Sequence, residues 1–355
     1  MIRDDVLEQG IVRGIVTSQQ VAGLRALALE LTAASAPEPE DDEKLRFVTG
    51  FSDIFVTLGL GLFLGAFGYF VANPSGLTAM WFGLAVAAWL LAEFFTRRRH
   101  MALPSIVLLA VFAVSVFTAT NDLLTGRPSN YLAGFLGYSV SMGSPGTTAA
   151  AMLMTSVAVA IHYIRFQVPI TIAAGAATIA GTLLSLLFAL APAFAEAAIR
   201  PISLVLGLII FALAMRFDLS DPARVTRRTD IAFWLHLLAA PLIVHPLISW
   251  FMAHDALLQV WTAVAVLAIF VALGIVAVVI DRRAMLVSGL VYAGYALSSL
   301  ISTIGLADRT LPATVLVLGA FVLLLSAGWR PVRSALLRLL PSHLAHRLPH
   351  PILSS

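Results

Sequence analysis

Long apolar stretches separated by short polar segments follow one another along most of the chain, from position 51 to position 328. Each stretch runs for about 20 residues, which is the length that a helix needs to cross the ~30 Å hydrocarbon core of a bilayer. Only helices and closed barrels satisfy their backbone hydrogen bonds in lipid, and barrel strands are shorter and alternate in polarity. The pattern therefore predicts an all-α polytopic membrane helix bundle of about ten transmembrane helices, at 51–72, 76–95, 101–120, 146–164, 168–192, 198–215, 231–252, 257–280, 284–304 and 310–328.

The overall composition supports a membrane protein and removes several kinds of chemistry. Hydrophobic residues make up 60% of the chain and charged residues 12%, which leaves too little polar surface to cover a water-soluble fold. The chain has no cysteine, so disulfides, thiolate metal sites and cysteine nucleophiles are excluded. The sequence contains no recognisable catalytic signature. We therefore expect no catalytic residue, no cofactor and no metal.

The basic residues fall almost wholly in alternate gaps between the apolar stretches. Arg127, Arg200 and Arg309 lie in one set of gaps, and all the other basic residues lie in the termini and the remaining gaps. The positive-inside rule then places both the N-terminus and the C-terminus in the cytoplasm. Arginine stands at every basic position except Lys44, a bias of GC-rich bacterial genomes. We therefore expect a multi-pass protein of the bacterial inner (cytoplasmic) membrane.

The two ends of the chain differ from its apolar middle. We expect a soluble helical hairpin and acidic linker at 1–43, a transmembrane domain at 44–328 and a cytoplasmic amphipathic tail at 329–355. In the first segment Thr17 and Gln20 have the spacing of a capping box, in which each side chain bonds the backbone N–H of the other residue. Residues 1–31 carry four acidic and three basic residues and show no basic stripe, which argues against nucleic-acid binding and favours a tether or a docking site for a protein partner.

Beyond position 329, leucines and arginines interleave in a helical pattern that stops at Pro341. A basic amphipathic helix of this kind is typical of segments that lie on the anionic lipid of the inner leaflet. We therefore expect the lipid bilayer, with anionic lipid at this helix, to be a partner of the protein. The alternative is that the helix merely extends the last crossing.

The seventh apolar stretch stands apart because it contains two prolines and two histidines. Pro241 and Pro246 lie in its middle, and since proline lacks a backbone N–H, each leaves a carbonyl one turn earlier without its helical partner. Broken helices at such a depth form the binding sites of many transporters. His236 and His245 are nine residues apart, which places them on opposite faces of an unbroken helix. They are therefore two separate candidates.

A polar seam between the seventh and ninth crossings is the candidate binding site. Tyr295 and Ser299 lie at a depth comparable with His245, and they continue a face that begins with Ser288 and Tyr292. We predict that the substrate-binding residues are His245, Tyr295, Pro241 and Ser299. The alternative is a structural role, in which these groups join neighbouring helices by hydrogen bonds of about 0.6 kcal/mol each.

The beginning of the chain resembles a known group of proteins. The residues that carry the resemblance are Gly10-Ile11-Val12, Ile15-Val16-Thr17, Gln20, and the glycines of the first crossing, Gly59, Gly61, Gly65 and Gly68. Over about the first seventy residues the chain is similar to a broad group of uncharacterised bacterial inner-membrane proteins, a domain family of unknown function. In that group a short soluble helical motif precedes a multi-helix membrane domain. The resemblance implies the same organisation here and carries over no functional residue.

Several of these glycines also support a prediction about helix packing. Gly61, Gly65 and Gly68 give the first crossing a small-residue face, and such faces let another helix approach closely. We therefore expect this face to pack against a neighbouring helix.

Two classes of function remain open. The first is a small-solute or ion transporter whose site lies near the proline-broken seventh helix. The alternative is a non-transporting membrane scaffold or regulator that binds partners through its cytoplasmic ends. An intramembrane enzyme ranks third, because no residue pattern supports one.

Overall fold

The computed structural model describes residues 12–23, 51–127, 143–221, 224, 226–252, 260–303 and 309–339. Every regular element in these ranges is a helix, which confirms the all-α fold. The chain divides into two compact units, residues 1–45 and 46–355.

The predicted capping box is present in the first unit, where residues 18–23 form a helix. The backbone N–H of Thr17 donates to Gln20 Oε1 at 2.9 Å, and the backbone N–H of Gln20 donates to Thr17 Oγ1 at 3.2 Å. These reciprocal bonds satisfy N–H groups that the first turn of a helix cannot pair internally. The predicted hairpin and linker otherwise lie outside the described residues.

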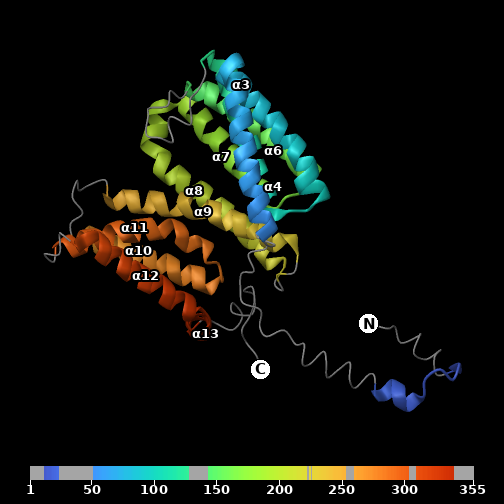
Figure 1. Ribbon diagram of the computed structural model, residues 1–355. Helices are drawn as coiled ribbons and strands as arrows, with labels where there is room; N and C mark the ends of the chain where they lie inside the picture. The colour runs from blue at the N-terminus through green and yellow to red at the C-terminus, as the bar shows by residue number, and fades with distance from the viewer. Residues whose placement is uncertain are drawn as a thin grey trace. The chain divides into compact units, whose positions relative to one another are not determined.

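Nine helices of the described chain are long and apolar enough to cross a membrane, which makes this a multi-pass membrane protein. Figure 1 shows them as coiled ribbons. Their bounds are α3 Phe51–Ala92, continued by the π-helix η1 Glu93–Arg98, then α4 Ala102–Thr125, α6 Pro145–Phe166, α7 Ile170–Leu190, α8 Pro192–Leu219, α9 Arg227–Met252, α10 Val260–Val279, α11 Ala284–Thr303 and α12 Thr310–Ala327.

The first of these helices folds back on itself. Its turn contains Pro74 and Gly76, and Gly76 has φ 84, a left-handed conformation that glycine adopts without strain. A Cβ added to Gly68 would lie 3.5 Å from Leu84, although residues this far apart on a straight helix would be separated by about 24 Å. Two antiparallel arms therefore form α3 and η1, blue to cyan in Figure 1. They correspond to the predicted crossings 51–72 and 76–95.

The small-residue face of the first arm packs only in part. Gly68 lies against Leu84 and Met80 of the second arm, as the prediction requires. A Cβ added to Gly61 or Gly65 would meet no atom of the described residues within 4 Å. These two glycines instead border an apolar groove, so the described residues do not show the predicted close packing at these positions.

The turn between α6 and α7 is tight. Helix α6 ends at Phe166, Gln167 adopts a left-handed φ of 53, and α7 begins at Ile170. Arg165 then pairs with Glu93 of η1, donating to its two carboxylate oxygens at 2.7 and 2.9 Å. Arg97 Nη1 also donates to Glu93 Oε2, at 3.3 Å.

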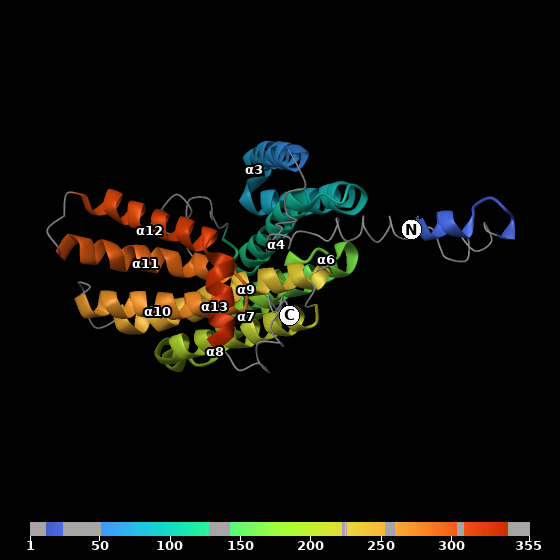
Figure 2. The same cartoon turned by 90° about the horizontal axis from the view of Figure 1, so that it is seen from below.

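Helix α9 is the central helix of the second unit. It contacts α7 and α8 on one side and α10 and α11 on the other (Figures 1 and 2). Its most apolar window is 56% buried, whereas the other spans of the described chain reach at most 44%. Gly207 of α8 permits the close crossing with α9, because a Cβ at that position would lie 2.9 Å from the backbone carbonyl carbon of Leu242.

The last described helix, α13 Trp329–Leu339, is separate from α12 and contacts α10. A turn at Gly328 divides the two helices, so α13 does not simply extend the last crossing. Trp329, Arg333 and Leu337 are buried at four-residue steps, which places them on the face that packs against the bundle. Contact of its other face with anionic lipid stays a prediction.

The basic turns of the bundle gather at one end. Arg165 reaches Glu93, Arg227 of α9 reaches Gln167 of the α6–α7 turn, and Arg282 reaches the carbonyl of Thr229. We call this end the basic end. Its cytoplasmic placement stays a prediction of the charge pattern.

Candidate functional site on helix α9

Helix α9 has an open face that is polar at both ends. At 100° per residue, one line along the helix carries Arg227, Asp230, Trp234, Pro241 and His245. Arg227, Pro241 and His245 are exposed, and the other two are half-buried. We call these five residues the open face of α9. His236 lies on the opposite face and is fully buried, which confirms the predicted separation of the two histidines.

The buried face of α9 meets a group of charges at the basic end. His236 donates from Nε2 to Asp218 Oδ2 of α8 at 2.9 Å. Arg282, in the turn between α10 and α11, donates from Nε to the same oxygen at 3.0 Å and contacts Oδ1 through Nη2. These side chains are at most 1% exposed. A charge buried to this extent is stable only when it is paired and hydrogen-bonded.

A second ion pair adjoins the first through the neighbouring residue. Asp281 accepts a bond from Arg224 Nη1 at 2.7 Å and another from Trp329 Nε1 at 2.7 Å. Asp281 and Arg282 are consecutive, so one turn ties together α8, the α8–α9 connection, α9 and α13. We call the residues Asp218, Arg224, His236, Asp281 and Arg282 the charge cluster.

Asp281 lies at the end of an apolar stretch of the sequence, where water would be expected to reach it, but the structure buries its side chain. Asp281 is 2% exposed, and Asp218 and Arg282 are 1% exposed. The only signal in the sequence was the occurrence of acidic and basic residues together at the ends of apolar stretches. Nothing in the spacing shows that Asp218 and Arg282, 64 positions apart, meet each other.

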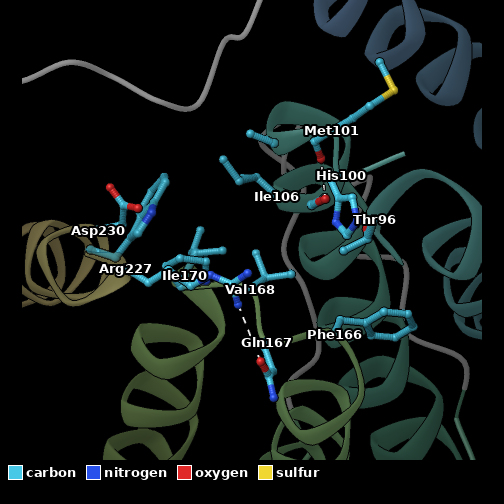
Figure 3. Close-up of a pocket in the computed structure, with 14 residues that line it drawn as sticks. Thr96, His100, Met101, Ile106, Phe166, Gln167, Val168, Ile170, Arg227 and Asp230 are labelled. Atoms are coloured by element: carbon cyan, nitrogen blue, oxygen red, sulfur yellow. Dashed lines mark hydrogen bonds between the residues drawn. The ribbon is translucent and has the colours of Figure 1, made fainter. Parts of the chain in front are cut away.

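A cavity of about 270 Å³ lies on the open face of α9 at the basic end. It is open on one side and is lined by the first two turns of α9, the α6–α7 turn, the end of η1 and the start of α4 (Figure 3). Arg227 and Asp230 line it from α9, with Gln167 from the turn and Thr96 and His100 from the other wall. Sequence reasoning missed this cavity because its walls come from segments that lie far apart in the sequence.

The predicted seam is formed in part at the other end of the open face. His245 Nδ1 hydrogen-bonds the hydroxyl of Tyr292 on α11. This joins the seventh and ninth crossings as predicted, through Tyr292 rather than the predicted Tyr295. Tyr295 is 53% exposed, Ser299 is half-buried, and Pro241 is exposed on α9. Substrate contact by His245, Tyr295, Pro241 and Ser299 stays a prediction.

Comparison with known proteins gives no match to a protein-family model, to a curated protein or to a solved structure. The resemblance of the first seventy or so residues to a bacterial membrane-protein family therefore stays a prediction. The described residues also contain no group of three or more histidines and carboxylates with the geometry of a metal site.

Proposed function

We propose that the protein moves a small polar solute or ion across the bacterial inner membrane along the open face of α9. The observation that carries this proposal is the placement of polar groups at both ends of the open face of α9, which is the most buried spanning helix of the described chain. A spanning helix with a purely structural role exposes apolar side chains to lipid, whereas ionisable groups within spans tend to mark pathways.

The distances along α9 suit a path across the bilayer. Arg227 and His245 are 18 positions apart, which corresponds to about 27 Å of helix rise, close to the ~30 Å thickness of the hydrocarbon core. The cavity lies at the first of these residues and the bond between His245 and Tyr292 at the second. Between them the open face is mainly apolar, which closes the path in this conformation.

The helix also has a fixed half and a half that can bend. The charge cluster holds the basic-end half of α9 through His236, against α8 and the α10–α11 turn. Pro241 and Pro246 follow, and helices bend most readily where proline interrupts the hydrogen-bond ladder. A bend there would open the apolar middle of the face to one side of the membrane and then to the other.

Removal of the seam should abolish transport without unfolding the protein. We expect His245→Ala and Tyr292→Phe to reproduce the growth defect of a deletion strain on the solutes that the protein supplies, with a transport rate lowered at least tenfold. Folded yield should change little, because a single bond between membrane helices contributes about 0.6 kcal/mol. Growth on single carbon and nitrogen sources, together with folded yield, measures both effects.

A matched control is Tyr69→Phe on the first arm, where the tyrosine is 66% exposed and lies far from α9 in sequence. This variant should behave as the wild type. Unchanged activity per folded molecule in both seam variants would remove the open face as the path and would favour the scaffold function.

A further inference from the structure

We infer that the cavity at the basic end of α9 binds a small zwitterion, an amino acid with an apolar side chain. The inference rests on the proposed function in one respect: it takes the molecule that the cavity binds to be the solute that the protein transports. Binding itself is a separate property of the cavity and is tested without transport.

The two charges on the α9 wall select the charged groups of the ligand. Arg227 and Asp230 are three positions apart on the same helix face, and both line the cavity. The Arg227 guanidinium has five N–H donors, and its bond to Gln167 Oε1, at 3.4 Å, is at the long end of the range for hydrogen bonds. Arginine recognises carboxylates, and a carboxylate such as Asp230 recognises an ammonium group. A ligand with both groups matches this wall.

The opposite wall contains Thr96, whose hydroxyl is covered in this conformation, so a ligand would meet it after a rotation of the side chain. Thr96 is 7% exposed, it lines the cavity, and its Oγ1 has no hydrogen-bond partner among the described residues. A buried polar atom without a partner is unfavourable by about 1–3 kcal/mol, so such atoms are rare unless water or a ligand completes them. Thr96 also belongs to η1, and short π-helical segments occur frequently at functional sites.

The remaining lining and the size of the cavity limit the ligand further. Ile106, Ile170 and Trp234 provide an apolar surface between the polar groups. A volume of about 270 Å³ corresponds to about nine water molecules at ~30 Å³ each, which suits a molecule of amino-acid size. A headgroup that carries only a phosphate fits less well, because the Asp230 carboxylate would repel it.

Three probes that differ only in their charged groups test the inference on the intact chain in detergent. L-Leucine carries both groups, 4-methylpentanoate lacks the ammonium group, and 3-methylbutylamine lacks the carboxylate. We expect isothermal titration calorimetry to show that L-leucine binds at least tenfold more tightly than either analogue. Glycerol 3-phosphate, as a headgroup fragment, should not bind.

Variants assign the selectivity to residues. Arg227→Gln should lower L-leucine affinity at least tenfold and remove the preference over 3-methylbutylamine. Asp230→Asn should lower it similarly and remove the preference over 4-methylpentanoate. Arg228→Gln is the matched control, because Arg228 is the exposed neighbour that does not line the cavity, and its affinity should equal that of the wild type.

The comparison of probes on the wild-type chain decides the inference even if a variant fails to fold. Equal binding of 4-methylpentanoate and L-leucine, binding of glycerol 3-phosphate alone, or no binding of L-leucine would each overturn it. Binding of L-leucine without uptake into vesicles would leave the cavity assignment standing and remove the transport function. Uptake of another solute without L-leucine binding would overturn the cavity assignment and leave the transport function standing.

Discussion

Replacement of Asp218 by alanine should lower the free energy of unfolding by about 3–5 kcal/mol, because it leaves Arg282 and His236 buried without their shared partner. The side chains of all three residues are at most 1% exposed, so water cannot replace the lost bonds. The effect is measured by heating the protein in detergent and then using size-exclusion chromatography to determine how much monodisperse protein remains at each temperature.

The control for this substitution is the exposed ion pair at the same end of the bundle. Glu93 and Arg165 are 30% and 40% exposed, so Glu93→Ala should lower stability far less than Asp218→Ala does. The double variant Asp218→Leu with Arg282→Met should recover part of the loss, since it removes both charges of the ion pair. Equal stability of Asp218→Ala and Glu93→Ala would contradict the account of the charge cluster.

Replacement of Trp329 by alanine should have a comparable effect, about 3–5 kcal/mol, because it empties the space of the largest fully buried side chain of the described chain. The same change removes the bond from Trp329 Nε1 to Asp281 and the contact with the Arg283 guanidinium, whose central carbon lies 5.0 Å from the ring centroid. The same heating assay applies, since it does not depend on tryptophan fluorescence.

Two further variants separate volume from hydrogen bonding at Trp329. Trp329→Phe keeps most of the ring and should lose only about 1–3 kcal/mol, the contribution of a buried bond to a charged group. Trp261 is 81% exposed, so Trp261→Ala should change stability little. If Trp329→Ala were no less stable than Trp261→Ala, α13 would not be packed against the bundle in the way described.

The features predicted correctly are those that depend on residues close together in the chain. The apolar runs determine the spanning helices, and Thr17 and Gln20 form their capping box with each other. The opposite placement of His236 and His245 follows from the helical repeat alone. Each of these predictions needed only the geometry of one element.

The features that were missed depend on which turns meet. Asp218 lies near the end of α8 and Arg282 in the turn between α10 and α11, so two spanning helices separate them in the chain. Hydrophobic periodicity does not determine how helices pack around one another. The same reason explains Gly65, which has the composition of a packing face but lies beside an apolar groove. The cavity was missed because Thr96, Gln167 and Arg227 come from three segments far apart in the sequence, which are η1, the α6–α7 turn and the start of α9.

The central claim is that the open face of α9 forms a path that can be reached from both sides of the membrane. The chain has no cysteine, so one introduced cysteine reports on its own position alone. Leu238 is half-buried and lies on the line of the open face between the cavity and His245, whereas Leu235 is fully buried.

The decisive measurement is the modification of Leu238→Cys by a membrane-impermeant thiol reagent, applied to right-side-out and to inside-out vesicles, with Leu235→Cys as the control. The account predicts modification of Leu238→Cys from both sides and none of Leu235→Cys. Modification of Leu238→Cys from neither side, or from one side only, would contradict it.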